Sequence, residues 1–169
     1  QKEASIEKKL NGIISTWGDD CTLSFNEYKD TKILDLGGLE EIVENVDLQS
    51  MDLMTMNASK DSEEFKDQLI KWQKTLKTID TVLVLWVKVQ KNWMRLEPIF
   101  LASEDIRAQL PEDTKRFEKV DADWKALMAD ACEDPPVVNA TNSEGRDKVL
   151  AEFIGEIDLC EKALNEYLE

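Results

Sequence analysis

The stretch VLVLWVKVQKNWMRLEPIF, residues 82–100, is apolar on almost every side and carries two of the chain's five tryptophans, Trp86 and Trp93. These two tryptophans lie seven residues apart, a spacing that returns a side chain to nearly the same face of a helix. The stretch therefore predicts a helix that neighbouring elements contact on several sides.

The apolar seam of this helix extends toward the N-terminus in alternating steps of four and three residues. Its members are Phe65, Leu69, Trp72, Leu76, Ile79, Leu83, Trp86, Gln90 and Trp93, of which only Gln90 is polar. We predict one helix over 62–96, about 50 Å long at ~1.5 Å per residue. Asp61 or Ser62 can cap its start, and Pro98 is expected to end it.

Aromatic side chains at helical spacing are usually buried in a protein core. We therefore expect Trp72, Trp86 and Trp93 to be packing residues. The alternative is that they form a binding face for another protein. The two interpretations merge if this helix shares its core with segments outside the chain.

Shorter elements are predicted on the N-terminal side of the long helix. Apolar spacing there predicts a helix over 4–17, a hairpin over 21–36 and a helix over 39–58. The first helix is expected to stop at Gly18 and Asp19–Asp20, and a polar turn is expected at 29–32. Gly37–Gly38 is expected to separate the hairpin from the next helix.

On the C-terminal side, apolar spacing predicts helices over 104–131 and 146–169. Ser103 is placed to cap the first of these, and Pro111 suits a first helical turn. Residues 133–145 are expected to form an extended linker, because Pro135–Pro136 excludes helix there. The prediction is a single segment over 1–169, mainly α, forming an elongated helical bundle with one long central helix and a small β-hairpin near residues 21–36.

Composition narrows the classes of partner. The chain has 36 acidic and 21 basic residues and a formal net charge of -15, which opposes binding to nucleic acid. No apolar run reaches the ~18 residues of a membrane span, so no membrane partner is expected. Three widely spaced cysteines fit a reducing cytosolic compartment. The start at Gln1 and the uncapped, periodic C-terminus lead us to expect a fragment of a longer polypeptide.

The sequence offers little chemistry. It has no histidine, which removes the commonest general base and zinc ligand, and no glycine motif that would cradle phosphate. The acidic pairs Asp19–Asp20 and Asp121–Asp123 lack the spacing of a calcium loop and are interpreted as solvated charges. We predict no catalytic, cofactor-binding or metal-ligating residue in this chain.

Residues 86–117 contain a run of fixed spacings, formed by Trp86, Val89–Gln90, Trp93, Leu96–Glu97, Ile99–Phe100, Ser103, Asp105–Ile106, Gln109–Leu110–Pro111 and Phe117. This run resembles the linker region of dynein heavy chains, whose pattern is W-x-x-V-Q-x-x-W-x-x-L-x-x-I-F followed by S-x-D-I and Q-L-P. The stretches RAQLPEDTKRF, PPVVNATN and LCEKALNEYL are most similar to axonemal heavy chains of the outer-arm beta type.

The resemblance implies a mechanical part rather than an enzyme. It implies the tail-proximal part of a linker, which moves relative to an ATPase ring as ATP is turned over and so transmits force in a microtubule motor. ATP and Mg²⁺ are then expected elsewhere in the parent chain. The implied partners are the ATPase ring and the remaining linker of the same heavy chain, with other dynein subunits through the parent tail. The implied location is the cytoplasmic cytoskeleton, in a ciliary or flagellar axoneme.

Large aromatic side chains wedged between helices would stiffen such a lever. The residues expected in this packing role are Trp72, Trp86, Trp93, Phe100, Phe117 and Trp124. The alternative function is a spectrin-like helical scaffold module of a cytoskeletal protein, which binds partners without ATP-driven movement. The hairpin and the Q-L-P turn fit a three-helix repeat poorly.

Overall fold

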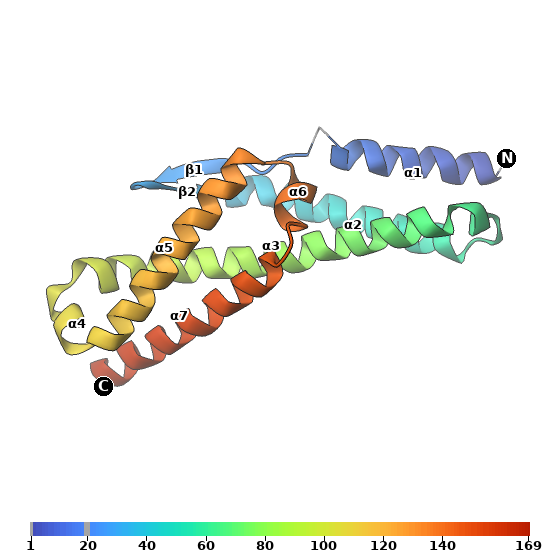
Figure 1. Ribbon diagram of the computed structural model, residues 1–169. Coiled ribbons are helices and arrows are strands. Elements are labelled where there is room, and N and C mark those ends of the chain that lie inside the picture. Colours follow the sequence, from blue (N-terminus) through green and yellow to red (C-terminus); the bar gives the residue numbers. More distant parts are fainter. Residues whose placement is uncertain (1, 19–20) are drawn as a thin grey trace. The chain divides into compact units, whose positions relative to one another are not determined.

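The computed structural model describes residues 2–18 and 21–169 and is mainly α, as predicted, with one long helix and a two-stranded hairpin (Figure 1). In chain order the elements are α1 (Lys2–Gly18), β1 (Phe25–Tyr28), β2 (Thr31–Leu34), α2 (Leu36–Ala58), the 3₁₀ helix η1 (Lys60–Phe65), α3 (Lys66–Ala102), α4 (Glu104–Gln109), α5 (Pro111–Glu133), α6 (Val137–Thr141) and α7 (Arg146–Leu168). The predicted stop at Asp19–Asp20 lies outside the described residues.

Contacts divide the chain into two compact units. Unit 1 contains the described residues up to Ser24 together with 35–83 and 134–143, and unit 2 contains 25–34, 84–133 and 144–169. The 37-residue α3 contributes its first half to unit 1 and its second half to unit 2. Apolar spacing reports only contacts between residues close in sequence, such as those within α3. The contacts of the hairpin with α3 and α5 join distant residues, so apolar spacing alone does not reveal the division into units.

The core of unit 1 forms where the apolar faces of α1, α2 and the first half of α3 are buried. Its side chains include Ile6, Leu10, Ile13 and Trp17 of α1, Leu39, Ile42, Val46, Leu53 and Met56 of α2, and Leu69, Leu76, Ile79, Val82 and Leu83 of α3. At the edge of this core the indole Nε1 of Trp17 donates to the side-chain oxygen of Gln49.

The expected break at Gly37–Gly38 is wrong, because both glycines lie in the first turn of α2. Asp35 caps this helix, and its carboxylate accepts a hydrogen bond from the Gly37 amide at 3.1 Å. A capped first turn tolerates glycine because the cap satisfies an amide that the helix leaves without a partner. The helix therefore begins at Leu36, three residues before the predicted start at residue 39.

The hairpin is shorter than the predicted range of 21–36. Its strands pair antiparallel from Phe25 opposite Leu34 to Tyr28 opposite Thr31, and Lys29 in the turn adopts a positive φ of 52°. The alternating residues before Phe25 pair elsewhere: Thr22 forms an isolated bridge with Pro136.

The expected extended linker over 133–145 is also wrong in part, because it contains the short helix α6. Val137, the first residue of α6, is fully buried, and its amide donates to the Cys21 carbonyl at 3.0 Å. Pro135–Pro136 excludes helix at those two positions, yet a proline immediately before a helix costs nothing, because the amide it lacks would have had no partner there.

In unit 2, α5 and α7 lie side by side, and α4 precedes α5 (Figure 1). The single helix predicted over 104–131 is two helices, because the chain leaves helical geometry at Leu110, which has φ -123° and ψ 61°. Pro111 then opens α5, in the first-turn position expected of it. The predicted helix 146–169 corresponds to α7.

Pro98 does not end the long helix, which continues to Ala102. Pro98 is exposed, so the carbonyl of Met94 that loses its intrahelical donor lies on the solvent side, where water can replace it. Leu96 and Phe100, which lie on either side of Pro98 in the same helix, are completely buried. We infer that this burial outweighs the lost hydrogen bond and the strain of proline within a helix.

Replacing Pro98 with alanine should stabilise the protein, because it restores the amide that can donate to the Met94 carbonyl and removes the clash of the proline ring. We expect the free energy of unfolding to rise by about 1 to 3 kcal/mol. A smaller opposing effect reduces this gain, because alanine gives the unfolded chain more conformational freedom than proline does. Urea unfolding followed by circular dichroism measures this change. Pro111→Ala is the matched control and should give no gain, because Pro111 is already at a helix start. A Pro98→Ala protein no more stable than the parent would contradict this interpretation.

Candidate functional site

The aromatic residues singled out from the sequence gather mainly in unit 2. Five of the six have side chains no more than about 1% exposed: Trp86, Trp93, Phe100, Phe117 and Trp124. They come from the second half of α3 and from α5. Trp72 differs, because it is only half-buried and belongs to unit 1. Trp72 fits the regular spacing of the seam, but neighbouring elements do not cover α3 equally along its length, so this side chain stays partly exposed.

Trp93 is the centre of this aromatic cluster. Its ring meets the ring of Tyr28 edge-on at a centroid distance of 5.4 Å, and the ring of Trp124 lies 5.7 Å away. The indole Nε1 of Trp93 donates to the Asp121 carboxylate at 2.8 Å. One side chain of α3 thereby contacts both the hairpin and α5.

The side chain of Gln90, the single polar member of the seam, forms hydrogen bonds with the backbone of the hairpin. Its side-chain oxygen accepts from the Leu34 amide at 2.6 Å, and its side-chain nitrogen donates to the Leu34 carbonyl at 3.0 Å. Gln90 and Leu34 are both 1% exposed. The side-chain amide therefore occupies the edge of β2 as a neighbouring strand would, and it satisfies two buried backbone groups.

Aromatic side chains also pack on either side of Trp93 along α3. Phe100 stacks on Phe117, with ring centroids 5.3 Å apart and an interplanar angle of 18°. Trp86 donates its Nε1 hydrogen to the Met128 sulfur at 3.2 Å, and the guanidinium of Arg146 lies 5.5 Å from the centroid of its ring. The second half of α3 thus contacts α5 through several aromatic side chains.

Charged side chains surround the tip of the hairpin. Lys29 forms an ion pair with Glu97 of α3, which also accepts a hydrogen bond from the Tyr28 hydroxyl at 3.3 Å. Lys125 of α5 lies 3.1 Å from the Asp121 carboxylate and 3.4 Å from that of Asp30. The hairpin tip is therefore attached to α3 by one lysine and to α5 by another.

The pKa values of both lysines reflect these contacts. The hydrogen bond to Glu97 raises the pKa of Lys29. For Lys125, partial burial alone would lower the pKa, but the hydrogen bonds and charges of Asp121 and Asp30 raise it overall. Both side chains are therefore cations at neutral pH, paired with carboxylates, and neither can act as a base.

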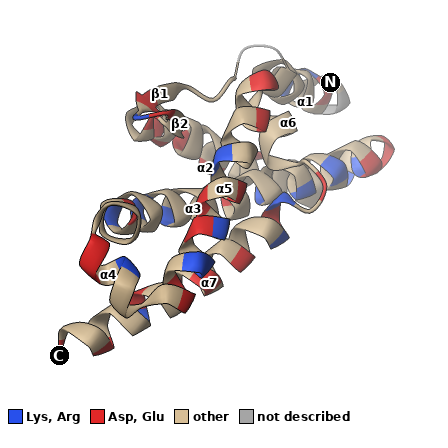
Figure 2. Cartoon of the chain, turned by 60° about the vertical axis from the view of Figure 1, so that its left-hand side comes forward, with Lys and Arg blue, Asp and Glu red and all other residues tan. Residues whose placement is uncertain are grey.

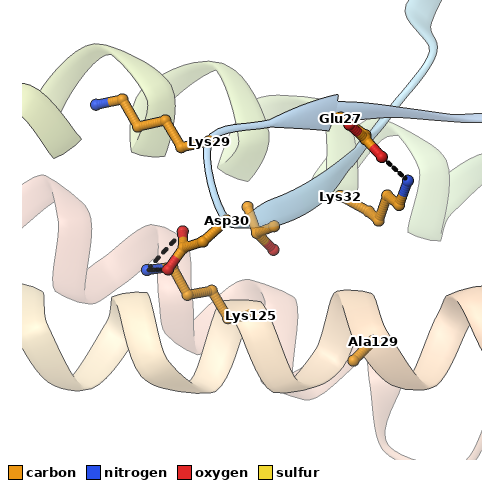
Figure 3. Close-up of a pocket in the computed structure, with 7 residues that line it drawn as sticks. Glu27, Lys29, Asp30, Lys32, Lys125 and Ala129 are labelled. Carbon is orange, nitrogen blue, oxygen red and sulfur yellow. Dashed lines mark hydrogen bonds and ion pairs between the residues drawn. The ribbon is translucent and has the colours of Figure 1, made fainter.

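A pocket of about 340 Å³ lies between the hairpin tip and α5 (Figure 3). It is lined by Glu27, Lys29, Asp30, Thr31, Lys32, Lys125 and Ala129. Figure 3 shows Lys32 paired with Glu27 and Lys125 paired with Asp30, while Lys29 extends away from both pairs. Because its charges neutralise one another in pairs, the pocket presents no concentrated charge for a phosphate or a metal ion.

The acidic pair Asp121–Asp123 does not form a joint site. The Asp121 carboxylate accepts a hydrogen bond from the Trp93 indole and forms an ion pair with Lys125. Asp123 instead lines a separate groove between α5 and α7. Within residues 2–18 and 21–169, no group of three His, Cys, Asp or Glu side chains is placed to hold a metal ion. Asp19–Asp20 lies outside the described residues.

The three cysteines are all free thiols. Burial raises the pKa of each, and it raises that of Cys160 to about 12, where the Sγ also lies 3.5 Å from the Asp113 carbonyl. These thiols are therefore protonated at neutral pH and weakly nucleophilic. Among the helices that the structure describes, none is both long and apolar enough to cross a membrane.

Sequence reasoning identified the tryptophans but missed the residues that connect them to the hairpin. Tyr28, Asp121 and Glu97 were not recognised as partners, because their contacts join positions 28 to 69 residues apart in the chain. Gln90 did carry a signal, since it is the only polar residue on an otherwise apolar seam. A lone buried amide needs a hydrogen-bond partner, and that partner is the unpaired edge of the hairpin.

The site is therefore a packing junction, and the fold is that of a helical module that carries a small hairpin. The whole chain, residues 1–169, matches the family described as "Dynein heavy chain, N-terminal region 2". The chain belongs to the dynein heavy chain family.

The chain is 40% identical over 168 residues to "Dynein beta chain, ciliary" of Heliocidaris crassispina and to "Dynein axonemal heavy chain 9" of Homo sapiens, in each case over 99% of its length. It is also 40% identical over 172 residues to "Dynein beta chain, flagellar outer arm" of Chlamydomonas reinhardtii. The chain spans about 4% of the length of these relatives. The resemblance found in the motif residues is thus confirmed over the whole chain.

Gln90→Leu should destabilise the protein, because it leaves the buried amide and carbonyl of Leu34 without partners. We expect a loss of about 2 to 6 kcal/mol in the free energy of unfolding, at roughly 1 to 3 kcal/mol for each of the two unsatisfied groups. Urea unfolding measures the loss. Gln68→Leu, an exposed position on the same helix, is the matched control and should change stability by less than about 0.5 kcal/mol. Equal effects of the two substitutions would refute the role of the amide.

Trp93→Ala should cost about 3 to 5 kcal/mol of unfolding free energy, through lost burial and the cavity left between the hairpin and α5. Trp72→Ala should cost less than half as much, because Trp72 is half-buried. Chemical unfolding of the two variants alongside the parent gives both values. If the midpoint and the slope for Trp93→Ala were unchanged, Trp93 would not be a packing residue.

Proposed function

We propose that this chain is the tail-proximal part of the linker of an axonemal dynein heavy chain, and that it transmits force. In this role the segment moves relative to the ATPase ring of the same heavy chain as ATP is turned over. It supplies stiffness, whereas ATP and Mg²⁺ are handled by other parts of the parent chain.

The observation that carries the proposal is the position of the family motif in the fold. The fixed residues Trp86, Gln90, Trp93, Phe100 and Phe117 are all buried in unit 2. They make the contacts that attach α3 to the hairpin and to α5. A motif that specifies packing rather than an exposed reactive group is what a mechanical element requires.

Membership of the family also supports the proposed setting. The relatives named above are described as ciliary, flagellar outer-arm or axonemal chains. We therefore propose a cytoskeletal location in a ciliary or flagellar axoneme. The proposed partners are the ATPase ring, the rest of the linker and the other subunits that the parent tail carries. The alternative of a spectrin-like scaffold is less favoured, because the hairpin is built into unit 2 and has no place in a three-helix repeat.

The test is to separate force transmission from ATP turnover in the full heavy chain. Trp93→Ala should slow microtubule gliding by a larger factor than it lowers basal ATP turnover, because it loosens the packing of the lever and leaves the catalytic modules unaltered. Gliding velocity and ATP hydrolysis are measured on the same preparation. Leu159→Ala, an exposed apolar position on α7, is the control and should change neither rate. Proportional loss of gliding and ATP turnover in the Trp93 variant would count against the mechanical role.

A further inference from the structure

The solvent-facing side of α2 in unit 1 carries three large apolar residues. Leu48, Met51 and Met54 are 63%, 65% and 66% exposed. Their spacing of three residues keeps them on one side of the helix, opposite the side that is buried against α1 and α3. We call these three residues the docking face. Single exposed apolar residues are common, but three neighbours on one helix side indicate a binding surface.

The charge around the docking face has one sign. The helix α2 contains Glu40, Glu41, Glu44, Asp47 and Asp52 and no lysine or arginine. Glu44 and Asp47 each lie four residues before a member of the docking face, and all five acids are exposed. Figure 2 marks the acidic and basic positions along the helices. The surface is therefore apolar with an acidic border.

A groove runs beside the docking face, between α2 and the first half of α3. It has a volume of about 310 Å³, and both helices belong to unit 1. The lining residues are Val46, Asp47, Ser50 and Met54 of α2 and Gln73, Leu76, Lys77 and Asp80 of α3. Met54 thus belongs both to the docking face and to the groove. The groove holds one cation, Lys77, among the lining residues.

We propose that the docking face and this groove bind an amphipathic helix of a partner protein, with an apolar ridge flanked by lysine and arginine. The groove between two helices accepts the ridge of a third. Methionine side chains adapt to apolar partners of different shape, and the acidic border complements basic flanks. This inference is independent of the proposed force transmission, because it uses unit 1 and none of the motif residues in unit 2.

The charge argues against other occupants. A second copy of this chain would place the same acidic border against itself, with a net charge of -15 on each partner. An anionic membrane surface would be repelled in the same way. A partner with basic flanks is the occupant whose charge is complementary.

The test uses two synthetic probes that differ only in charge. Both are amidated peptides of about 18 residues, or roughly five helical turns, with leucine on one helix side. One carries lysine at the remaining positions and the other carries glutamate. Binding to the chain is measured by fluorescence anisotropy at about 0.15 M salt, where non-specific charge attraction is largely screened. We expect binding of the lysine peptide and none of the glutamate peptide.

Two pairs of variants separate the docking face from the overall charge. Leu48→Ser/Met51→Ser/Met54→Ser should weaken binding of the lysine peptide at least about tenfold. Val84→Ser/Leu159→Ser, which removes exposed apolar side chains elsewhere, should leave it unchanged. Glu44→Gln/Asp47→Asn should weaken binding more than Asp158→Asn/Glu166→Gln, which removes the same charge from α7. Circular dichroism checks that each variant keeps its helices.

Several results would overturn the proposal. Equal binding by the parent and the triple serine variant would mean that the lysine peptide binds the net charge alone. Equal weakening by the two charge variants would lead to the same conclusion. Sedimentation that shows a dimer of the parent, lost in the triple serine variant, would assign the face to a second copy of the chain. Binding of the parent, but not of the triple serine variant, to vesicles with anionic lipid would assign it to a membrane.

Discussion

The two hydrogen bonds between the side-chain amide of Gln90 and the backbone of Leu34 are the constraint on which unit 2 depends. A two-stranded hairpin is at best marginally stable in water, and its edges carry unpaired backbone groups. By satisfying one edge from inside the core, Gln90 fixes the hairpin on α3. That placement brings Tyr28 against Trp93, whose indole reaches Asp121 of α5.

This arrangement explains which features of the sequence were informative. The regular seam predicted a long helix and its buried tryptophans because helical periodicity depends on neighbouring residues alone. The same pattern suggested burial for Trp72, yet it carries no information on how many sides of the helix are covered. The expectation that Pro98 ends the helix is wrong for a related reason. Local preference ends a helix there, but the tertiary burial of Phe100 against Phe117 outweighs that preference.

The partners in the site could not be predicted, because each contact joins segments distant in sequence. Gln90 was visible as a polar exception, but the hairpin edge that it satisfies lies 56 residues earlier. In the proposed lever, these long-range contacts are what matters. Bending between α3 and its neighbours would have to separate packed rings and expose buried polar groups, and both changes are costly. The stiffness that we propose for this segment of a dynein heavy chain therefore resides in the junction rather than in the helix alone.

The most direct test asks whether the hairpin unfolds together with the helices that it contacts. Native-state hydrogen exchange at increasing urea concentrations reports the opening free energy of the Leu34 amide, which donates to the Gln90 side-chain oxygen. If the junction is one cooperative unit, this value should agree within about 0.5 kcal/mol with those of the buried Val89 and Met128 amides in α3 and α5. A Leu34 amide that exchanges by local opening, while the two helices stay protected, would contradict the account.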